Sequence, residues 1–239
     1  MKLDILAFGA HPDDVELGAG GLLAKEAAEG KKTGIIDLTR GEMGTRGTPE
    51  IRDLEAQEAA RILGSSVRIN LQMADGFFAN NAAHQESVAR SLRIYRPDIV
   101  IANAPEDRHP DHGKGSQLVR DACFLSGLWK WKIQDEKGQE LKAWRPKVLY
   151  YYIQFRELKP DLIVDISGYH EQKMESVQAH KSQFYDPNSK EPETLIASKE
   201  FFESVTYRAR NYGRIIGVPY GEGYIADRTL GSPNLSSLI

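Results

Sequence analysis

The sequence predicts an α/β fold with a doubly wound, mostly parallel sheet of the Rossmann-like type and helices on both faces. Two observations support this class. Short buried runs alternate with stretches of helical period up to residue 128. Glycine or proline ends several of the helical stretches. Such alternation of strand and helix is typical of parallel sheets. We treat residues 1–239 as a single domain, since no linker, repeat or low-complexity segment interrupts them.

The first half gives the clearest elements. Leu3–Phe8 is an apolar run, and in the next stretch Val15, Ala19 and Leu23 recur on one helical face that ends at Gly30. The remaining patterns predict strands at 34–38, 67–71 and 98–102, and helices at 50–63, at 113–128 and in a stretch that ends before Pro97.

The second half is less regular. Residues 129–145 are polar with scattered tryptophans and are expected to form an excursion from the sheet. Strands are expected at 148–153 and 162–166, followed by helices near 169–184 and 195–213. The glycine-rich tail at 217–224 is expected to be turn-rich and to cross back over the sheet.

Composition excludes several classes of protein. A net charge of −3 gives no electrostatic reason for binding nucleic acid or an anionic membrane. No window approaches the roughly 18 apolar residues of a membrane span, and the first residues do not resemble a signal peptide. Cys123 is the only cysteine, so a cytoplasmic location and a buried, structural thiol are expected.

Two short motifs, Ala10–Asp14 and Asp107–His112, carry most of the functional information. Each follows a buried strand and spaces polar ligands three residues apart. Together they offer three ligands for a divalent metal, with a carboxylate and an imidazole left for proton transfer. These are the side chains that a metal-dependent hydrolase requires.

The predicted fold explains how motifs about a hundred residues apart could meet. Both follow a strand at its carboxyl end, and sites in open parallel sheets form outside those ends, where the winding reverses. Gly18, Gly20 and Gly21 cost stability in a helix, so a close approach to backbone or ligand is expected there.

Each motif alone also fits a structural role. The first could be a helix cap and the second a polar turn, but their equivalent positions in the fold favour a shared site. Of the other histidines, His84 is expected to be solvated and His170 to begin a helix, whereas His180 has a weaker claim to face the site.

At these residues the chain resembles the LmbE-like, or PIG-L, family of zinc-dependent N-acetylglucosamine deacetylases. Ala10–Gly21 matches the first family motif without gaps, and His109–His112 matches the second. Stretches at 58–64, 107–113 and 181–184 resemble the members that deacetylate N-acetylglucosaminyl-L-malate in bacillithiol biosynthesis.

The resemblance implies a role for each motif residue. His11, Asp14 and His112 would bind Zn²⁺, one ion per subunit, although Fe²⁺ accepts the same ligands. Asp13 would be the general base and then return its proton to the leaving amine. His109, if protonated, would stabilise the oxyanion, and Asp111 would orient His109. The family also points to a homo-oligomer, a trimer or hexamer.

Substrate recognition requires further groups. Malate carries two carboxylates, which arginine forks suit better than lysine. Arg108 adjoins the second motif and Arg52 begins a helix, so both are expected to bind the N-acetylated glucosaminide. Arg46 is a third possibility, in a glycine-rich loop at 41–47 that could act as a gate. Trp129 and Trp131 could form a sugar platform, but packing or a subunit interface is favoured.

Three rival functions stay open. Two share the chemistry: an amidase of bacillithiol conjugates and a deacetylase of chitooligosaccharides or another N-acetylglucosamine compound. The third is a non-catalytic nucleotide- or sugar-binding module with a structural metal. The single cysteine disfavours the third, because structural zinc sites usually use cysteine.

Overall fold

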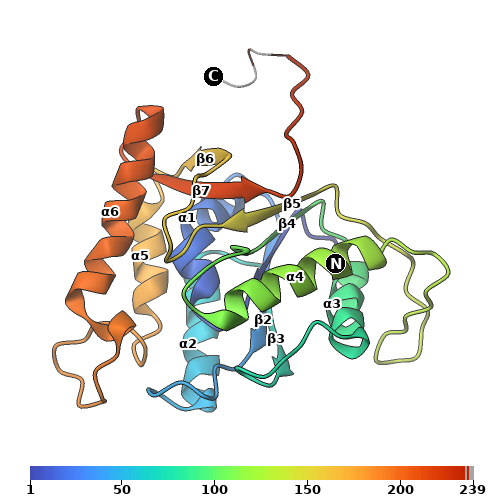
Figure 1. The fold of residues 1–239 in the computed structure, drawn as a ribbon, viewed down its shortest axis with the longest axis horizontal. Helices are drawn as coiled ribbons and strands as arrows, with labels where there is room; N and C mark the ends of the chain where they lie inside the picture. Colours follow the sequence, from blue (N-terminus) through green and yellow to red (C-terminus); the bar gives the residue numbers. More distant parts are fainter. Residues whose placement is uncertain (235, 237–239) are drawn as a thin grey trace.

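A seven-stranded sheet with the order β3-β2-β1-β4-β5-β7-β6 forms the centre of the computed structural model, which describes residues 1–234 and 236 (Figure 1). Strands β1 to β5 are parallel, whereas β7 runs antiparallel to both β5 and β6. The predicted α/β class with a mostly parallel sheet is confirmed. The strands are β1 Ile5–Gly9, β2 Thr33–Thr39, β3 Val67–Met73, β4 Ile99–Asn103, β5 Val148–Tyr152, β6 Leu162–Asp165 and β7 Gly221–Ala226.

Helices cover both faces of the sheet (Figure 1). On one face, α1 buries Val15, Ala19 and Leu23 against alternate residues of β1 and β2. On the other face, α3 and α4 bury residues such as Val88 and Leu118 against the opposite side of the same strands. The helices are α1 Asp14–Ala28, α2 Pro49–Ile62, α3 Ala82–Tyr95, α4 Pro110–Leu125, α5 His170–Gln178 and α6 Lys199–Ile216.

The winding direction reverses between β1 and β4, which are neighbours in the sheet. From β1 the chain proceeds outward through β2 to β3, and from β4 it proceeds the other way to β5. The carboxyl ends of β1 and β4 therefore open side by side at the point where ligand sites form in such sheets.

Close packing explains two of the glycines of α1. A Cβ atom on Gly18 would lie 2.1 Å from the Tyr152 ring, and one on Gly21 would lie 2.6 Å from the Ile166 side chain. These distances confirm the expected close approach. The helix can therefore lie directly on β5 and on the segment that follows β6.

The prediction for the tail was wrong. Residues 221–226 form β7, which inserts between β5 and β6 instead of crossing over the sheet. Gly221 and Gly223 resemble turn residues in the sequence, but here they make room for the neighbouring Ile163 and Tyr212 side chains. The long-range pairing with β5 and β6 outweighs this local preference.

Several helix boundaries also differ from the prediction, and α6, for example, runs over Lys199–Ile216 instead of 195–213. Helix α4 begins at Pro110 instead of 113, because proline is favoured in the first turn of a helix. Helix α5 ends at Gln178 instead of 184. His180 is consequently in the turn after the helix.

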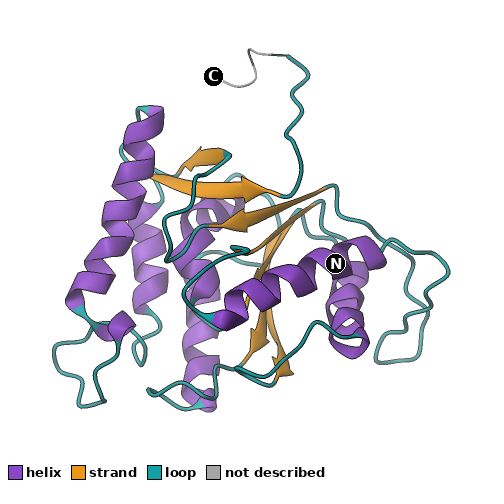
Figure 2. Ribbon diagram, viewed as in Figure 1, coloured by secondary structure: helices purple, strands orange, loops and turns teal. Residues whose placement is uncertain are grey.

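The segment between α4 and β5 is the expected excursion and is drawn as a loop in Figure 2. It contains an isolated bridge between Gln134 and Glu140. Arg93 anchors it through hydrogen bonds to backbone carbonyl groups of the segment. Cys123 is buried nearby, and burial raises the pKa of its thiol, as expected for a structural residue.

Among the helices of the described residues, none is both long and apolar enough to cross a bilayer.

Candidate metal-dependent active site

A cavity of about 210 Å³ lies at the carboxyl ends of β1 and β4. Seven of the eight residues predicted for the site border it, and the eighth, Asp111, is fully buried with a carboxylate oxygen 3.5 Å from His11. The fold therefore brings both motifs together. The seven are His11, Asp13, Asp14, Arg52, Arg108, His109 and His112.

His112 lies between two carboxylates. Its Nε2 is 3.1 Å from Oδ1 of Asp14, and its Nδ1 is 2.7 Å from Oδ2 of Asp107. The Asp107 contact keeps a proton on Nδ1, so that Nε2 faces Asp14 and offers its lone pair to a metal once it gives up its own proton. This is the arrangement in which a carboxylate on the far nitrogen orients a metal-binding histidine.

His11 is held in the same way. Its Nδ1 is 3.5 Å from Oδ2 of Asp14, and its Nε2 is 3.0 Å from Oδ1 of Asp75. Asp75 is itself fixed, since its Oδ2 accepts a hydrogen bond from the Met43 backbone N–H. Both imidazoles thus present one nitrogen towards Asp14 and anchor the other to a carboxylate.

Asp14 is held rigidly at the first position of α1. Its carboxylate accepts hydrogen bonds from the His11 backbone N–H at 2.9 Å, from Asn103 Nδ2 at 3.0 Å and from Gln154 Nε2 at 2.5 Å. Asn103 ends β4 and Gln154 follows β5, so three strands contribute to the position of this one carboxylate.

These residues fit a divalent metal. One ring nitrogen from each of His11, His109 and His112 lies within 4.8 Å of the other two, and the Asp14 carboxylate lies beside the rings of His11 and His112. Imidazole nitrogen and carboxylate oxygen are typical ligands of catalytic zinc, in sites that keep one position open. A His/Asp metal site is therefore present in outline, whereas the predicted ligand set of His11, Asp14 and His112 stays a prediction.

The charges of the site also favour a cation. Burial lowers the pKa of His112, but Asp14 and Asp107 outweigh this effect and raise it to about 9. Burial raises the pKa of Asp14, yet His112 and His11 hold it well below its usual range. The carboxylates thus attract positive charge, which a bound metal ion would supply in place of these protons.

Asp13 has a strained backbone, with a φ of 119° that favours glycine. Burial raises the pKa of its carboxyl to about 6, although the nearby Arg52 charge opposes this effect. A carboxylate with a pKa near 6 is suited to accept and return a proton close to neutral pH.

Arg52 holds Asp13 in place. Its Nη2 donates to Asp13 Oδ2 at 3.2 Å and to the Pro12 carbonyl at 2.8 Å, and its Nη1 donates to the Gly41 carbonyl at 2.9 Å. Arg52 was expected to bind substrate. It borders the cavity, but most of its donors are already engaged, and its clearest role is to position Asp13.

The expected contact from the Asp111 carboxylate to His109 does not form among the described residues. That carboxylate accepts from the Gly76 N–H at 2.7 Å and pairs with Lys114 at 2.5 Å, since it points towards the loop after β3. His109 is instead oriented by backbone, because the Asp111 N–H donates to its Nδ1 at 3.3 Å. This contact leaves the ring proton of a neutral His109 on Nε2.

A second group of charges lies beneath Asp13. Arg68 pairs with both Glu16 and Asp37, and His180 Nε2 is 3.2 Å from Glu16. All four side chains are buried. His180 therefore underlies the site instead of facing the cavity, and its positive charge, when present, lowers the pKa of Asp13.

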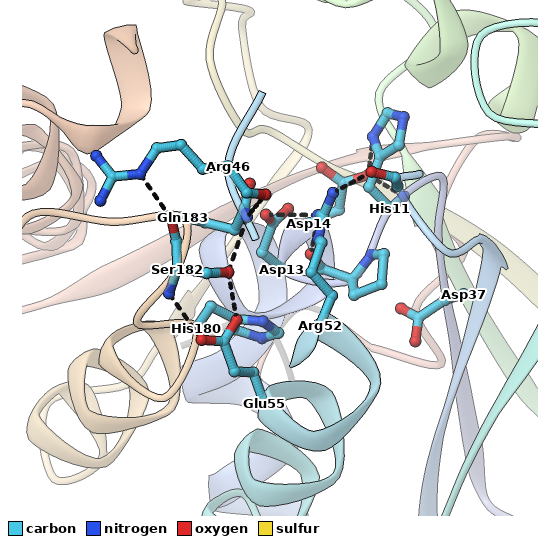
Figure 3. A network of polar contacts seen from close by, with 12 residues as sticks. His11, Asp13, Asp14, Asp37, Arg46, Arg52, Glu55, His180, Ser182 and Gln183 are labelled. Atoms are coloured by element: carbon cyan, nitrogen blue, oxygen red, sulfur yellow. Dashed lines mark hydrogen bonds and ion pairs between the residues drawn. The ribbon is translucent and has the colours of Figure 1, made fainter. Parts of the chain in front are cut away.

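The loop at 41–47 is pinned to the segment after α5 (Figure 3). Arg46 is buried, and its guanidinium donates to the Ser182 carbonyl at 2.7 Å and to Ser189 Oγ at 2.8 Å. Gln183 Nε2 in turn donates to the Arg46 carbonyl at 2.8 Å. Arg46 therefore fastens this loop and is not among the residues that border the cavity.

Sequence reasoning missed four polar residues of the site. Asp107 opens the second motif, but nothing in its spacing distinguishes it from a surface residue. Asp75, Asn103 and Gln154 each lie at or just after the carboxyl end of β3, β4 or β5. Their shared position at the carboxyl ends of strands is the feature of the sequence that could have identified them as site residues. Trp129 and Trp131, in contrast, do not border the cavity, and Trp129 is 71% exposed.

The fold and the site together define a metal-dependent hydrolase of the α/β class. A family model described as PIG-L, GlcNAc-PI de-N-acetylase, matches residues 6–123, which include both motifs. The chain belongs to this PIG-L, or LmbE-like, deacetylase family.

Individual proteins support this assignment. A diacetylchitobiose deacetylase of Thermococcus kodakarensis is 29% identical over 92% of this chain and 81% of its own length. A conserved protein of Thermus thermophilus is 38% identical, with a TM-score of 0.85 over 97% of this chain and 98% of that one. An N,N'-diacetylchitobiose deacetylase of Pyrococcus horikoshii is 26% identical, with a TM-score of 0.78 over 98% and 88% of the two chains.

The predicted enzyme class, a metal-dependent deacetylase of N-acetylglucosamine-containing compounds, is confirmed at the level of the family. None of these relatives is described as acting on a malate conjugate.

Proposed function

We propose that this chain removes the N-acetyl group from N-acetylglucosaminyl-L-malate and releases acetate and glucosaminyl-L-malate. The observation that carries the deacetylase part is the arrangement of His11 and His112. Each presents one nitrogen to Asp14 and anchors the other to a carboxylate, beside the strained Asp13. The malate part rests on the resemblance and on Arg108, whose side chain borders the cavity.

In this proposal His11, Asp14 and His112 hold a Zn²⁺ ion. The ion, when bound, polarises the amide carbonyl and lowers the pKa of water to about 7. Asp13 takes the proton of the attacking water and returns it to the leaving nitrogen. Arg52 holds the Asp13 carboxylate in place for both transfers. A positioned acid–base group of this kind is worth about 10²–10⁴-fold in rate.

His109 stabilises the negative charge that develops on the carbonyl oxygen. The Asp111 N–H occupies Nδ1 of His109, so Nε2 carries a proton and can donate it in a hydrogen bond. A donor fixed before the reaction begins costs no reorganisation in the transition state.

Arg108 is the proposed contact for a malate carboxylate. It is exposed, borders the cavity and has its guanidinium carbon 5.2 Å from the centre of the Phe155 ring. Its side chain forms no hydrogen bond or ion pair with the described residues, so its donors are available to a ligand.

The experiment is a measurement of primary-amine release by the zinc-loaded enzyme. N-acetylglucosaminyl-L-malate, N-acetylglucosamine and diacetylchitobiose are compared, with D13N and the surface variant D121N. We expect turnover of the malate conjugate, a loss of about 10²–10⁴-fold in D13N, and unchanged turnover in D121N.

Preferential turnover of diacetylchitobiose would show that the group beyond the sugar is a second sugar and not malate. The similarity to the two diacetylchitobiose deacetylases supports this second candidate function. Absence of turnover of every substrate, with zinc bound, would reject the proposed function. The homo-oligomer and the cytoplasmic location stay predictions.

A further inference from the structure

Arg208, on helix α6, is a partly buried cation without a direct hydrogen-bond or ion-pair partner for its side chain among the described residues. Its guanidinium makes no hydrogen bond or ion pair with residues 1–234 or 236, although the side chain is only partly exposed. Burial lowers its pKa, whereas electrostatic interactions with Tyr212, Asp107 and Glu157 act in the opposite direction. A guanidinium has five N–H donors, and leaving them partly dehydrated and unpaired is costly.

Arg208 borders a second, open cavity of about 780 Å³ between residues 155–159 and α6. This cavity adjoins the catalytic one, because Phe155 belongs to the wall of both. Phe155 is held by stacking on Phe201, with ring centres 6.2 Å apart. A ligand whose reacting end lies among the histidines can therefore extend past Phe155.

Arg208 also lies within electrostatic reach of the catalytic centre. Its charge interacts with Asp107, the carboxylate that fixes His112. The second cavity contains one more cation, Lys159, and one carboxylate, Glu157. The cavity lining thus carries a net positive charge, with Glu157 opposing it.

We propose that Arg208 and the cavity beside it bind the anionic group that the substrate carries beyond its sugar. Arg108 borders the catalytic cavity and Arg208 borders the second cavity, and the two cavities meet at Phe155. A dicarboxylate such as malate offers one carboxylate to each guanidinium, and each fork can engage two oxygen atoms. This inference rests on the proposed function for the identity of the sugar.

The experiment measures binding instead of turnover, so its outcome is independent of the deacetylase assay. Glucosaminyl-L-malate, glucosamine 1-phosphate and methyl glucosaminide, which all lack the acetyl group, are titrated calorimetrically into the zinc-loaded protein. The two anionic ligands separate a carboxylate from a phosphate, and the methyl glycoside measures the sugar alone.

In R208Q, we expect the preferred anionic ligand to bind about 10–100-fold more weakly, with methyl glucosaminide unchanged. R210Q is the matched control, since Arg210 lies on the same helix, is exposed and faces Tyr220 instead of the cavity. It should bind like the wild type. In E157Q, loss of the opposing carboxylate should strengthen anion binding roughly two- to fivefold.

Thermal unfolding of R208Q and R208K shows whether either variant is misfolded. If R208Q does not fold, the titrations are made with R208K, which keeps the positive charge but lacks the guanidinium group. The proposal is overturned if the Arg208 variants weaken all three ligands equally, or if they match R210Q. It is also overturned if the wild type has no preference for either anion.

Discussion

At the scale of single residues, the two imidazoles that face Asp14 depend on carboxylates on their other side. Asp107 fixes His112 and Asp75 fixes His11. Neither carboxylate faces Asp14 itself, yet together they decide which nitrogen of each ring is free to bind a metal. The motif residues therefore work only within a second group of side chains that the motifs do not specify.

Changing Asp107 to Asn tests this dependence. The amide keeps the shape and can still accept the hydrogen bond from the Arg156 N–H, but it no longer offers His112 a charged acceptor. We expect Zn²⁺ affinity to fall about 10–100-fold. Competition with a chelator of known affinity measures it. D121N, which changes a partly exposed carboxylate on the same helix α4, should bind zinc normally. Equal zinc affinities in D107N and D121N would contradict the argument.

At the scale of elements, Glu222 on β7 connects three parts of the fold. Its carboxylate accepts hydrogen bonds from the Gly21 and Leu22 N–H groups of α1 and pairs with Lys173 of α5 at 2.6 Å. Strand β7 is thereby tied to α1 and α5, two of the helices on this side of the sheet. Since Glu222 and Lys173 are both buried, each needs the other to offset the loss of water.

Replacing Lys173 with Met should therefore destabilise the protein by about 3–5 kcal/mol, because the Glu222 charge would stay buried without its cation. Urea unfolding measures this difference. K199M removes the same charge from an exposed pair with Glu203 on α6 and should change stability by no more than about 0.5 kcal/mol. Similar losses in both variants would refute the role given to the buried pair.

The first residue of α5 makes the stability of this region depend on pH. His170 is buried, stacks on Tyr220 with ring centres 4.0 Å apart, and lies near Lys173. Burial, together with the Lys173 charge, lowers its pKa to about 4. The unfolded chain therefore takes up a proton on this histidine at a higher pH than the folded protein does.

It follows that stability is complete above the unfolded pKa of about 6.5 and is lost as the pH falls from there towards 4. Between pH 7 and pH 5 we expect His170 to account for about 1–2 kcal/mol of that loss. Urea unfolding of the wild type and H170N at both pH values measures it. An equal loss in H170N would show that other groups are responsible.

At the scale of the whole molecule, the candidate site exists because three distant segments meet where the sheet reverses its winding. His11 and Asp14 follow β1, His112 lies in the first turn of α4 after β4, and Asp75 follows β3. Folding gathers these mutually repelling carboxylates around two imidazoles, and a cation would relieve the repulsion. Metal binding should thus be coupled to the stability of the entire sheet.

Adding Zn²⁺ should consequently raise the melting temperature. At a free concentration of 100 times the dissociation constant, the ion adds about 2.7 kcal/mol to the free energy of unfolding. Differential scanning calorimetry with zinc, and then with excess chelator, measures the rise and its reversal. D14N should lose most of the effect. The same rise in D14N would exclude Asp14 as a ligand.

The sequence by itself determined the class of fold, the two motifs and their position after β1 and β4. It could do so because the periodicity of apolar residues and the glycine and proline residues that end helices are local properties of the chain. Tertiary structure alone decided that residues 221–226 become β7, that Arg52 holds Asp13, and that the Asp111 carboxylate points away from His109. Each of these outcomes depends on contacts between segments that are far apart in the sequence. Such contacts form through long-range packing, and no periodic pattern of residues in the sequence indicates them.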